Sequence, residues 1–156
     1  MKQLKVDAIK DGTVIDHIPA GTAFHILECL NLREEDPVTV GTQLLSKKYG
    51  RKDIIKIENR EFSIDELQII TLLAPSASFV TIRNYEAINK EIARIPDEIR
   101  GVISCPNPAC ICNSEVMVSR FVVESREPVE MRCGYCEHLY KLDDITRFLL
   151  SMRAKK

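Results

Sequence analysis

Cysteine side chains carry the strongest chemical signal in the sequence. The chain of 156 residues holds six cysteines, and five of them fall within 32 residues of its C-terminal third. Four residues separate Cys105 from Cys110, two separate Cys133 from Cys136, and 22 residues lie between the two pairs. In a reducing compartment, such pairs indicate metal or redox chemistry before structural disulfides. Two short turns that face each other can supply the four thiolates of a tetrahedral zinc ion, with metal–sulfur distances of about 2.3 Å.

Four thiolates would occupy every coordination position, so the spacing predicts one structural rather than catalytic zinc ion per chain. Iron in a rubredoxin-like site would use the same four thiolates. Cys112 lies two residues beyond Cys110 and could compete as a ligand, but we interpret it as a bystander because each pair already supplies two ligands. His138 is an alternate candidate ligand, and Cys29, alone in a helical pattern, is predicted to be a small core residue.

The charge balance argues against a polyanion-binding protein. Basic residues number 22 and acidic residues 23, for a net charge of -1, and the two parts on either side of residue 100 carry 14 basic against 16 acidic and 8 against 7. Duplex binding usually leaves a basic footprint, whereas a small anionic ligand needs only two or three basic side chains. No stretch approaches the ~18 apolar residues of a membrane span, and the polar start is unlike a signal peptide. We therefore expect a cytoplasmic protein.

Hydrophobic periodicity in the first 90 residues alternates between strand and helix patterns. Leu4, Val6 and Ala8 recur at period two, which predicts a first strand. Ser63 and Glu66 have the spacing of a capping box, which predicts the start of a helix that ends before residue 75. The order predicts an α+β fold in which a mixed or antiparallel sheet carries two helices on one face. The other predicted elements are strands over 14–18, 38–45, 52–59 and 78–83, a helix over 21–32 and a short return through 85–88.

The region after residue 100 is too small for a conventional core. Residues 90–100 contain Pro96 and several charges and are predicted to be a connector. Two strand-like segments between the cysteine pairs predict a β-hairpin, and the final segment predicts a short helix that starts at Leu142. A domain of about 55 residues without tryptophan usually needs stabilisation beyond its hydrophobic core, and the predicted metal provides it.

Polar residues of the N-terminal half form no known catalytic motif. Asp16 and His17 end a predicted strand, Lys56 lies in the middle of another, and Lys90 follows the turn near Tyr85. Isolated charges of this kind are mostly just solvated. The sequence contains no Gly-rich phosphate loop, nucleophile elbow or His-Glu metal motif, so the chain is predicted not to be an enzyme.

Six sequence runs together resemble one family over nearly the whole chain. They are VDAIKDGTVIDHIPAG, GRKDIIKIEN, LLAP, NYE, CPNPAC and CGYCE. A four-cysteine pattern alone is common, but its combination with the first two runs is specific. The chain resembles the regulatory chains of aspartate carbamoyltransferase, the enzyme that opens pyrimidine biosynthesis. The resemblance implies a non-catalytic allosteric subunit that binds ATP or CTP, pairs with a second regulatory chain and links catalytic trimers.

The resemblance also implies domain roles and site residues. Residues 1–98 would form the nucleotide-binding and dimerisation domain, and residues 99–156 the zinc-binding domain that docks on the catalytic chain. The first strand would line the base, Asp16 and Lys56 would lie at the ribose, and His17 and Lys90 would face the phosphates. The implied nucleotide site is Val6, Asp7, Ala8, Ile9, Asp16, His17, Lys56, Ile82, Tyr85, Ala87 and Lys90. The metal ligands would be Cys105, Cys110, Cys133 and Cys136, and the contacts with the catalytic chain Asn107 and Glu137.

Two other classes of function compete with this one. A zinc protein that binds nucleic acid would grip RNA or DNA with its cysteine turns, but the second half is near-neutral and lacks an aromatic stacking platform. A thiol oxidoreductase would use Cys133 and Cys136 as its redox pair. Redox pairs lie at a helix N-terminus, whereas these two cysteines follow a predicted strand. One tightly held zinc ion per chain would contradict the redox interpretation.

Overall fold

The chain forms two compact units, which are described separately. The computed structural model describes residues 8–30, 32–48, 50–115 and 117–154, without the side chains of residues 153 and 154. Unit 1 contains the described residues up to 23, Leu32–Phe62 and Ser76–Ala93. Unit 2 contains residues 24–30, Ser63–Pro75 and the chain from residue 94 onward. Two sheets and four helices lie in the described residues, which confirms the predicted α+β class.

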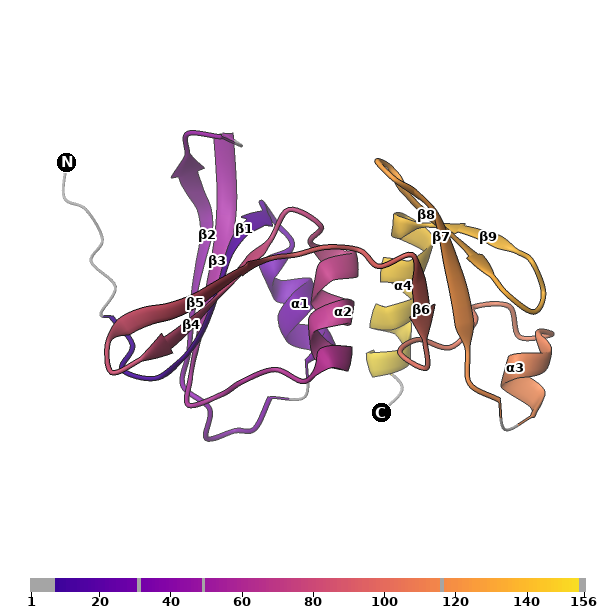
Figure 1. The fold of residues 1–156 in the computed structure, drawn as a ribbon, viewed down its shortest axis with the longest axis horizontal. Coiled ribbons are helices and arrows are strands. Elements are labelled where there is room, and N and C mark those ends of the chain that lie inside the picture. The colour runs from indigo at the N-terminus through magenta and orange to yellow at the C-terminus, as the bar shows by residue number, and fades with distance from the viewer. Residues whose placement is uncertain (1–7, 31, 49, 116, 155–156) are drawn as a thin grey trace. The chain divides into compact units, whose positions relative to one another are not determined.

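Unit 1 is built on a five-stranded sheet (Figure 1). Every neighbouring pair of its strands is antiparallel, which settles the predicted choice between a mixed and an antiparallel sheet. The strand order is β2-β3-β1-β4-β5, so β1 lies in the middle and β2 and β5 form the edges. The strands are β1 (Gly12–Pro19), β2 (Val38–Ser46), β3 (Gly50–Glu58), β4 (Ser78–Arg83) and β5 (Glu86–Ile92).

The two faces of this sheet differ because side chains alternate along each strand. Ile15 pairs with Ile55 on one side and Phe79 on the other, and all three are buried. Thr13 and Ile57, the next pair along β1 and β3 on this face, are buried as well. The buried apolar side chains of these strands therefore lie on one face, and the opposite face carries the charged residues described below.

The chain before β1 differs from the prediction. The predicted first strand falls mostly on residues 1–7, which lie outside the described residues, and Ala8 and Ile9 are not in a strand. The carbonyl of Lys10 instead accepts a hydrogen bond of 2.9 Å from the amide of Tyr85, in the turn between β4 and β5. The described residues before β1 thus bind a turn through a main-chain carbonyl.

The predicted connector over residues 90–100 is wrong at both of its ends. β5 continues to Ile92, and Glu98–Arg100 form the strand β6. All seven residues of β5 are exposed. A strand without a buried face does not need alternating apolar and polar residues, so the local sequence does not identify β5 as a strand. Pairing with β4 defines β5 instead, and this long-range interaction leaves no local pattern in the sequence.

A buried carboxylate that the sequence analysis missed fixes two loops of unit 1. Asp53 on β3 is fully buried. It accepts hydrogen bonds from the backbone amides of Gly21 at 2.9 Å, Ala23 at 3.1 Å and Gln43 at 2.9 Å. The first two amides belong to the chain that follows β1, and the third lies at an irregularity in β2. Gln43 has a φ of 57°, and Asp53 helps hold this uncommon conformation.

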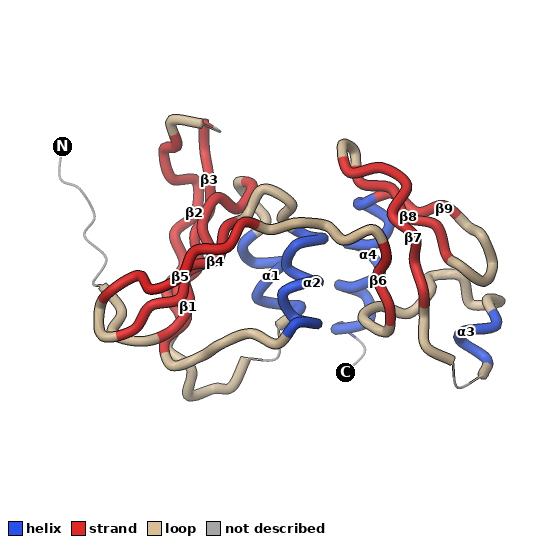
Figure 2. The backbone as a smooth tube through the Cα atoms, viewed as in Figure 1, coloured by secondary structure: helices blue, strands red, loops and turns tan. Residues whose placement is uncertain are grey.

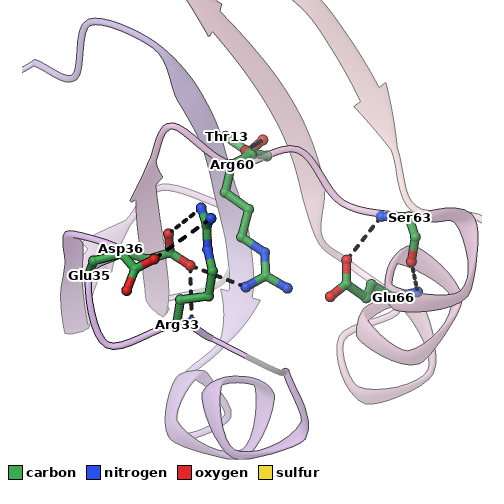
Figure 3. A network of polar contacts seen from close by, with 7 residues as sticks. All are labelled: Thr13, Arg33, Glu35, Asp36, Arg60, Ser63 and Glu66. Carbon is green, nitrogen blue, oxygen red and sulfur yellow. Dashed lines mark hydrogen bonds and ion pairs between the residues drawn. The ribbon is translucent and has the colours of Figure 1, made fainter.

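A second buried carboxylate joins the chain before β2 to the chain after β3 (Figure 3). The Asp36 carboxylate lies 2.9 Å from the guanidinium of Arg33 and 3.3 Å from that of Arg60. The carbonyl of Arg60 also accepts a 2.8 Å hydrogen bond from the hydroxyl of Thr13 on β1. The hydrogen bond from Arg33 holds the pKa of Asp36 below its ordinary value of 3.8.

Unit 2 contains most of α1 (Ala23–Cys29) and all of α2 (Ile64–Leu73). The predicted capping box of α2 is confirmed and is visible in Figure 3. The amide of Glu66 donates to the hydroxyl of Ser63 at 3.2 Å, and the amide of Ser63 donates to the Glu66 carboxylate at 3.0 Å. The first helix is shorter than the predicted 21–32.

The rest of unit 2 is a four-stranded sheet of order β6-β7-β8-β9 with two further helices, as Figure 2 shows. The predicted hairpin between the cysteine pairs is β7–β8, and the predicted last helix is α4. Leu72 of α2 belongs to the same buried cluster as Phe121, Ile145 and three of the cysteines. Among the described residues, no helix is long and apolar enough to cross a bilayer. The elements are β6 (Glu98–Arg100), α3 (Ile111–Ser114), β7 (Arg120–Arg126), β8 (Val129–Cys133), β9 (Leu139–Lys141) and α4 (Leu142–Ala154).

Replacement of Asp53 by Ala should lower the free energy of unfolding by about 2–4 kcal/mol, because three backbone amides lose their acceptor and a cavity forms. Chemical denaturation of the full chain measures this change. Glu34→Ala, at an exposed acidic residue, serves as the control and should change the stability little. A loss below about 0.5 kcal/mol for Asp53→Ala would contradict the role of this carboxylate.

Replacement of Asp36 by Asn should flatten the loss of stability in acid. The folded-state pKa of Asp36 is depressed, so its ion pairs stabilise the protein above its ordinary pKa of 3.8, and this contribution is lost as the pH falls through the lower folded value. Urea denaturation between neutral pH and about pH 3 should show a smaller pH dependence for Asp36→Asn than for the wild type. Identical pH profiles would show that the Asp36 pairs do not contribute.

Candidate metal centre and ligand-binding face

The sulfur atoms of the two predicted cysteine pairs lie at distances that suit a metal ion. The Sγ atoms of Cys105 and Cys136 are 3.7 Å apart, as are those of Cys110 and Cys133. A tetrahedral ion with metal–sulfur bonds of about 2.3 Å holds its ligands about 3.8 Å from one another. The thiols are free, and these separations far exceed the ~2.05 Å of a disulfide bond. The residues present therefore fit a tetrahedral thiolate site.

Backbone amides of both cysteine turns point toward the sulfur atoms. Hydrogen bonds of this kind stabilise a thiolate relative to a thiol. They also fix each sulfur in place before a metal binds. The amide of Asn107 donates to the sulfur of Cys105, that of Cys112 to Cys110, and those of Tyr135 and Cys136 to Cys133.

Burial opposes the ionisation of these thiols. It raises the pKa of Cys105 to about 12, although the hydroxyl of Tyr140 lies 3.4 Å from its sulfur. Burial also raises the pKa of Cys133. At Cys110 burial acts in the same direction, but hydrogen bonds from the amide and thiol of Cys112 and from neighbouring thiols outweigh it and lower the pKa to about 7. Metal binding must therefore release protons and must strengthen as the pH rises.

Cys112 also lies within the cluster, at the start of α3. Its Sγ atom is 3.3 Å from that of Cys110. The sulfurs of Cys105, Cys110, Cys112 and Cys133 all lie within 4.8 Å of one another. The structure thus offers five sulfurs for four positions. His138 is exposed and its ring lies against that of Tyr140, with the centroids 5.3 Å apart, and Cys29 is buried as predicted.

The two residues predicted to contact the catalytic chain lie in the cysteine turns. The side-chain oxygen of Asn107 accepts a 3.0 Å hydrogen bond from the amide of Ala109, within the first turn. Glu137 follows Cys136, has a φ of 62° and exposes its side chain. Its amide donates to the carbonyl of Cys133 at 3.0 Å. Any change in the geometry of the cysteine turns would therefore move both residues.

The second candidate site is the polar face of the five-stranded sheet. Residues directly opposite one another on antiparallel strands point to the same face. Successive rows of such residues cross this face, and the predicted site residues fall into them. Row 1 is Asp16, Ser78 and Ile92; row 2 is Lys56, Val14, Val80 and Lys90; row 3 is Glu58, Gly12, Ile82 and Ala87.

The strand register places the two predicted lysines in the same row, but on strands that are not neighbours. Lys56 lies on β3 and Lys90 on β5, with β1 and β4 between them. Three strand spacings of ~4.8 Å separate their backbones by about 14 Å. The two lysines would therefore approach one ligand from different strands of the face.

His17 lies at the row 1 end of the face. It has a φ of 57° at the bulge of β1, and its Nδ1 atom is 3.0 Å from the hydroxyl of Ser78. With Lys90 and Lys48 it lines a cavity of about 170 Å³, and with Arg51 it lines a second cavity of about 650 Å³. The structure therefore places cationic side chains around His17. Sequence analysis missed Lys48 and Arg51, for which the only available signal was their positions on either side of the β2–β3 turn.

Asp16 carries its charge beside a lysine. Its Oδ1 atom lies 2.9 Å from the ammonium of Lys52 and accepts a 2.6 Å hydrogen bond from the amide of His17. Partial burial favours the neutral acid, but these two groups outweigh it and lower the pKa of Asp16. The side chain is therefore a carboxylate at neutral pH.

At the row 3 end, Ile82 on β4 and Ala87 on β5 are apolar, whereas Glu58 on β3 carries a charge. Tyr85, in the turn beyond row 3, has a φ of 68° and is exposed. Ile9 is buried and Ala8 exposed in the segment whose Lys10 carbonyl binds Tyr85, whereas Val6 and Asp7 lie outside the described residues. Gly12 has a φ of 146°, and a Cβ atom there would lie 2.1 Å from a backbone oxygen of β3, so this position requires glycine.

Removal of the metal should unfold much of residues 101–156. Three of the cysteines belong to this small core, and without the metal its burial is too small to offset the conformational entropy lost on folding. Hydrogen exchange after chelation should show lost protection in β7 and β8, with protection retained in β1 and β3. Cys133→Ser should reproduce this change in exchange, whereas Cys112→Ser should keep its metal. Unchanged protection in β7 and β8 after complete metal removal would contradict a structural metal.

Comparisons with known proteins divide the chain into two matched regions. Residues 4–93 match the family described as the aspartate carbamoyltransferase regulatory chain, allosteric domain. Residues 97–146 match the metal binding domain of the same regulatory chain. Together the two matches cover most of the chain.

Individual relatives are similar over nearly their full length. The aspartate carbamoyltransferase regulatory chain of Thermococcus kodakarensis is 45% identical over 150 residues, which is 95% of this chain and 99% of the relative. Those of Methanothermobacter thermautotrophicus and Saccharolobus solfataricus are 46% identical over 145 residues and 45% identical over 151 residues. They cover 92% and 95% of this chain, and 93% and 95% of the relatives. The predicted resemblance is confirmed: the chain belongs to the family of aspartate carbamoyltransferase regulatory chains and is a non-catalytic component of pyrimidine biosynthesis.

Proposed function

We propose that residues 1–98 form an allosteric domain that binds ATP or CTP on the polar face of the five-stranded sheet. The observation that carries this proposal is the arrangement of that face, which runs from the apolar Ile82 and Ala87 at row 3 to a cationic end around His17. A nucleoside triphosphate has the same polarity, with an aromatic base at one end and several negative charges at the other.

The base would lie at the row 3 end. Ile82 and Ala87 offer apolar contacts there, Gly12 adds no side chain between β3 and β4, and Tyr85 borders the turn. Main-chain groups of residues 6–9 would read the base edges, with Ala8 and Ile9 leading into the segment that binds Tyr85. Backbone groups suit this task because they are fixed in position.

The phosphates would lie at the His17 end. His17 and Lys90 line the same cavity, together with the hydroxyl-bearing Ser78. We add Lys48 and Arg51 to the predicted phosphate contacts, because each lines a cavity that His17 also borders. Charge-assisted hydrogen bonds from such groups to phosphate oxygens are stronger than neutral ones.

The ribose would lie between these two ends. Both contacts of Asp16 use Oδ1, so its Oδ2 atom can accept a hydrogen bond from a ribose hydroxyl. The backbone of Lys56 lies about 14 Å from that of Lys90 across the sheet, which leaves Lys56 for contact with ribose and base rather than with the terminal phosphates.

We further propose that residues 99–156 hold one zinc ion and dock on the catalytic chain, thereby linking catalytic trimers. Zinc would be held by Cys105, Cys110, Cys133 and Cys136 and would supply structural charge rather than chemistry, because four thiolates leave no open position. Asn107 and Glu137 would contact the catalytic chain from the cysteine turns. The free thiols fit the reducing cytoplasm.

We also propose that the regulatory chain dimerises through its N-terminal domain, along the edge strand β2. Leu45 on this strand is 76% exposed, and Leu44 is also exposed. An apolar edge strand with unpaired backbone groups favours association with another strand. A second copy of the chain would cover both.

Replacement of Lys90 by Ala should weaken CTP and ATP by a similar factor of about 10- to 100-fold, because this lysine meets the phosphates that the two nucleotides share. Replacement of Lys56 by Ala should instead change the ratio of the two affinities. Calorimetry with the full chain measures both effects, and Lys141→Ala, on β9, is the matched control that should leave both affinities unchanged. Unchanged binding in both the Lys56 and Lys90 variants would reject this site.

Replacement of Leu45 by Gln should convert the isolated chain from a dimer to a monomer, because it removes apolar surface from the proposed contact. Ile64→Gln is the matched control, since Ile64 is 74% exposed but lies on α2. Sedimentation at micromolar concentration, with metal present, measures the association state. A monomeric wild type, or a dimer that tolerates Leu45→Gln fully, would contradict dimerisation through β2.

A further inference from the structure

The cysteine cluster contains one thiol more than a tetrahedral metal site can use. Metal sites of the structural type bind four ligands almost without exception. Of the five cysteines in the cluster, Cys105, Cys110 and Cys133 are buried, whereas Cys112 and Cys136 are only half-buried. The three buried thiols are thus fixed members, and the two half-buried thiols are the ones with room to move.

The positions of the sulfurs allow two different sets of four. Cys136 completes one set, with its sulfur 3.7 Å from that of Cys105. Cys112 completes the other, because its sulfur and those of the three buried cysteines all lie within 4.8 Å of one another. A tetrahedral edge of about 3.8 Å requires shifts of only about 1 Å from these separations. The two sets share the same three buried thiols.

The five sulfurs do not fit around one ion at the same time. The sulfurs of Cys110 and Cys112 are 3.3 Å apart, which is shorter than the edge of a tetrahedron of thiolates. Cys112 must therefore move away from Cys110 by about 0.5 Å before it can take a coordination position. It can enter the coordination sphere when another ligand leaves.

Local contacts hold Cys112 close to this position. It lies in α3, a single turn of four residues directly after Cys110. The side-chain amide of Asn113 donates hydrogen bonds of 2.8 Å to the carbonyls of Cys105 and Asn107, which ties α3 to the first cysteine turn. A thiol held in this way has a high local concentration at the metal.

Cys136, by contrast, ends an exposed turn. It lies between β8 and β9, and its neighbours Tyr135 and Glu137 are both exposed. Glu137 also adopts a φ of 62°, an uncommon conformation for a residue with a side chain. Of the thiols proposed as ligands, Cys136 is therefore the one most readily released.

From this geometry we infer that Cys112 is a reserve metal ligand, which takes the fourth coordination position when Cys136 leaves it. The inference rests on the proposed zinc centre and adds a second ligand set to it. Exchange of one thiolate for another keeps the charge and the number of sulfurs at the ion constant. The metal, and with it the core of unit 2, would persist while the turn that carries Glu137 is released.

The test compares the metal content and spectra of four full-length variants purified with zinc and, separately, with cobalt. Cys136→Ser should retain one metal ion per chain, and its cobalt form should keep the absorption spectrum of four thiolate ligands. The double variant Cys112→Ser/Cys136→Ser should lose metal affinity by more than the ~10- to 100-fold that changes outside the coordination sphere cause. Cys133→Ser should lose its metal although Cys112 is present, because Cys133 belongs to both sets. Cys112→Ser alone should retain the metal.

A second measurement uses only variants that keep all four proposed ligands. A chelator should extract zinc from Cys112→Ser several-fold faster than from the wild type, because transient release of Cys136 is no longer followed by capture. Cys29→Ala, which removes a thiol outside the cluster, should match the wild type. Equal metal loss in Cys136→Ser and the double variant, or a three-thiolate cobalt spectrum in Cys136→Ser, would overturn the inference. A wild type that binds no metal would instead reject the zinc centre itself.

Discussion

Five sulfur atoms gathered in a largely buried cluster can carry several thiolate charges together only when a cation lies among them. Burial alone raises the pKa of Cys105 and Cys133, and the backbone amides directed at the sulfurs offset this only in part. The cation thus makes the thiolate form stable, and the thiolates hold the cation. The surrounding core depends on this mutual stabilisation, because the same buried cluster contains Phe121, Met131 and Ile145 from three different elements.

The buried cluster around the cysteines also includes a residue from much earlier in the sequence. Leu72 belongs to its core but lies on α2, which the chain forms between β3 and β4 of the other sheet. α2 begins with a satisfied capping box and ends in a run of buried residues. The buried core that contains three of the cysteines therefore also includes a residue of a helix that is covalently joined to the five-stranded sheet at both ends.

Strand register brings residues that are distant in sequence together on the polar face. Lys56 and Lys90 are 34 positions apart in sequence, yet the pairing of four antiparallel strands places them in one row. Along a regular strand, successive side chains point to opposite faces. The bulge of β1 interrupts this alternation at His17. The side chain of His17 thereby borders the cavities at the cationic end.

Local signals allowed much of this to be predicted from the sequence, and long-range ones did not. The capping box at Ser63 and the hairpin between the cysteine pairs follow from short spacings, and both are confirmed. The return through residues 85–88 was predicted, but the continuation of β5 to Ile92 was not, because its fully exposed residues show no alternation. Asp53 was missed for a related reason. Its role depends on amides 10 to 32 positions away, which no pattern around residue 53 reveals.

The metal centre is the claim on which most of the account depends, and X-ray absorption of the purified full chain tests it most directly. Combined with elemental analysis, it gives the identity of the metal, the number per chain and the atoms bound to it. The account predicts one zinc ion per chain with four sulfur neighbours at about 2.3 Å, whichever of the two half-buried cysteines supplies the fourth. Oxygen or nitrogen atoms in the coordination sphere, iron in place of zinc, or disulfide-bonded cysteines without metal would contradict it.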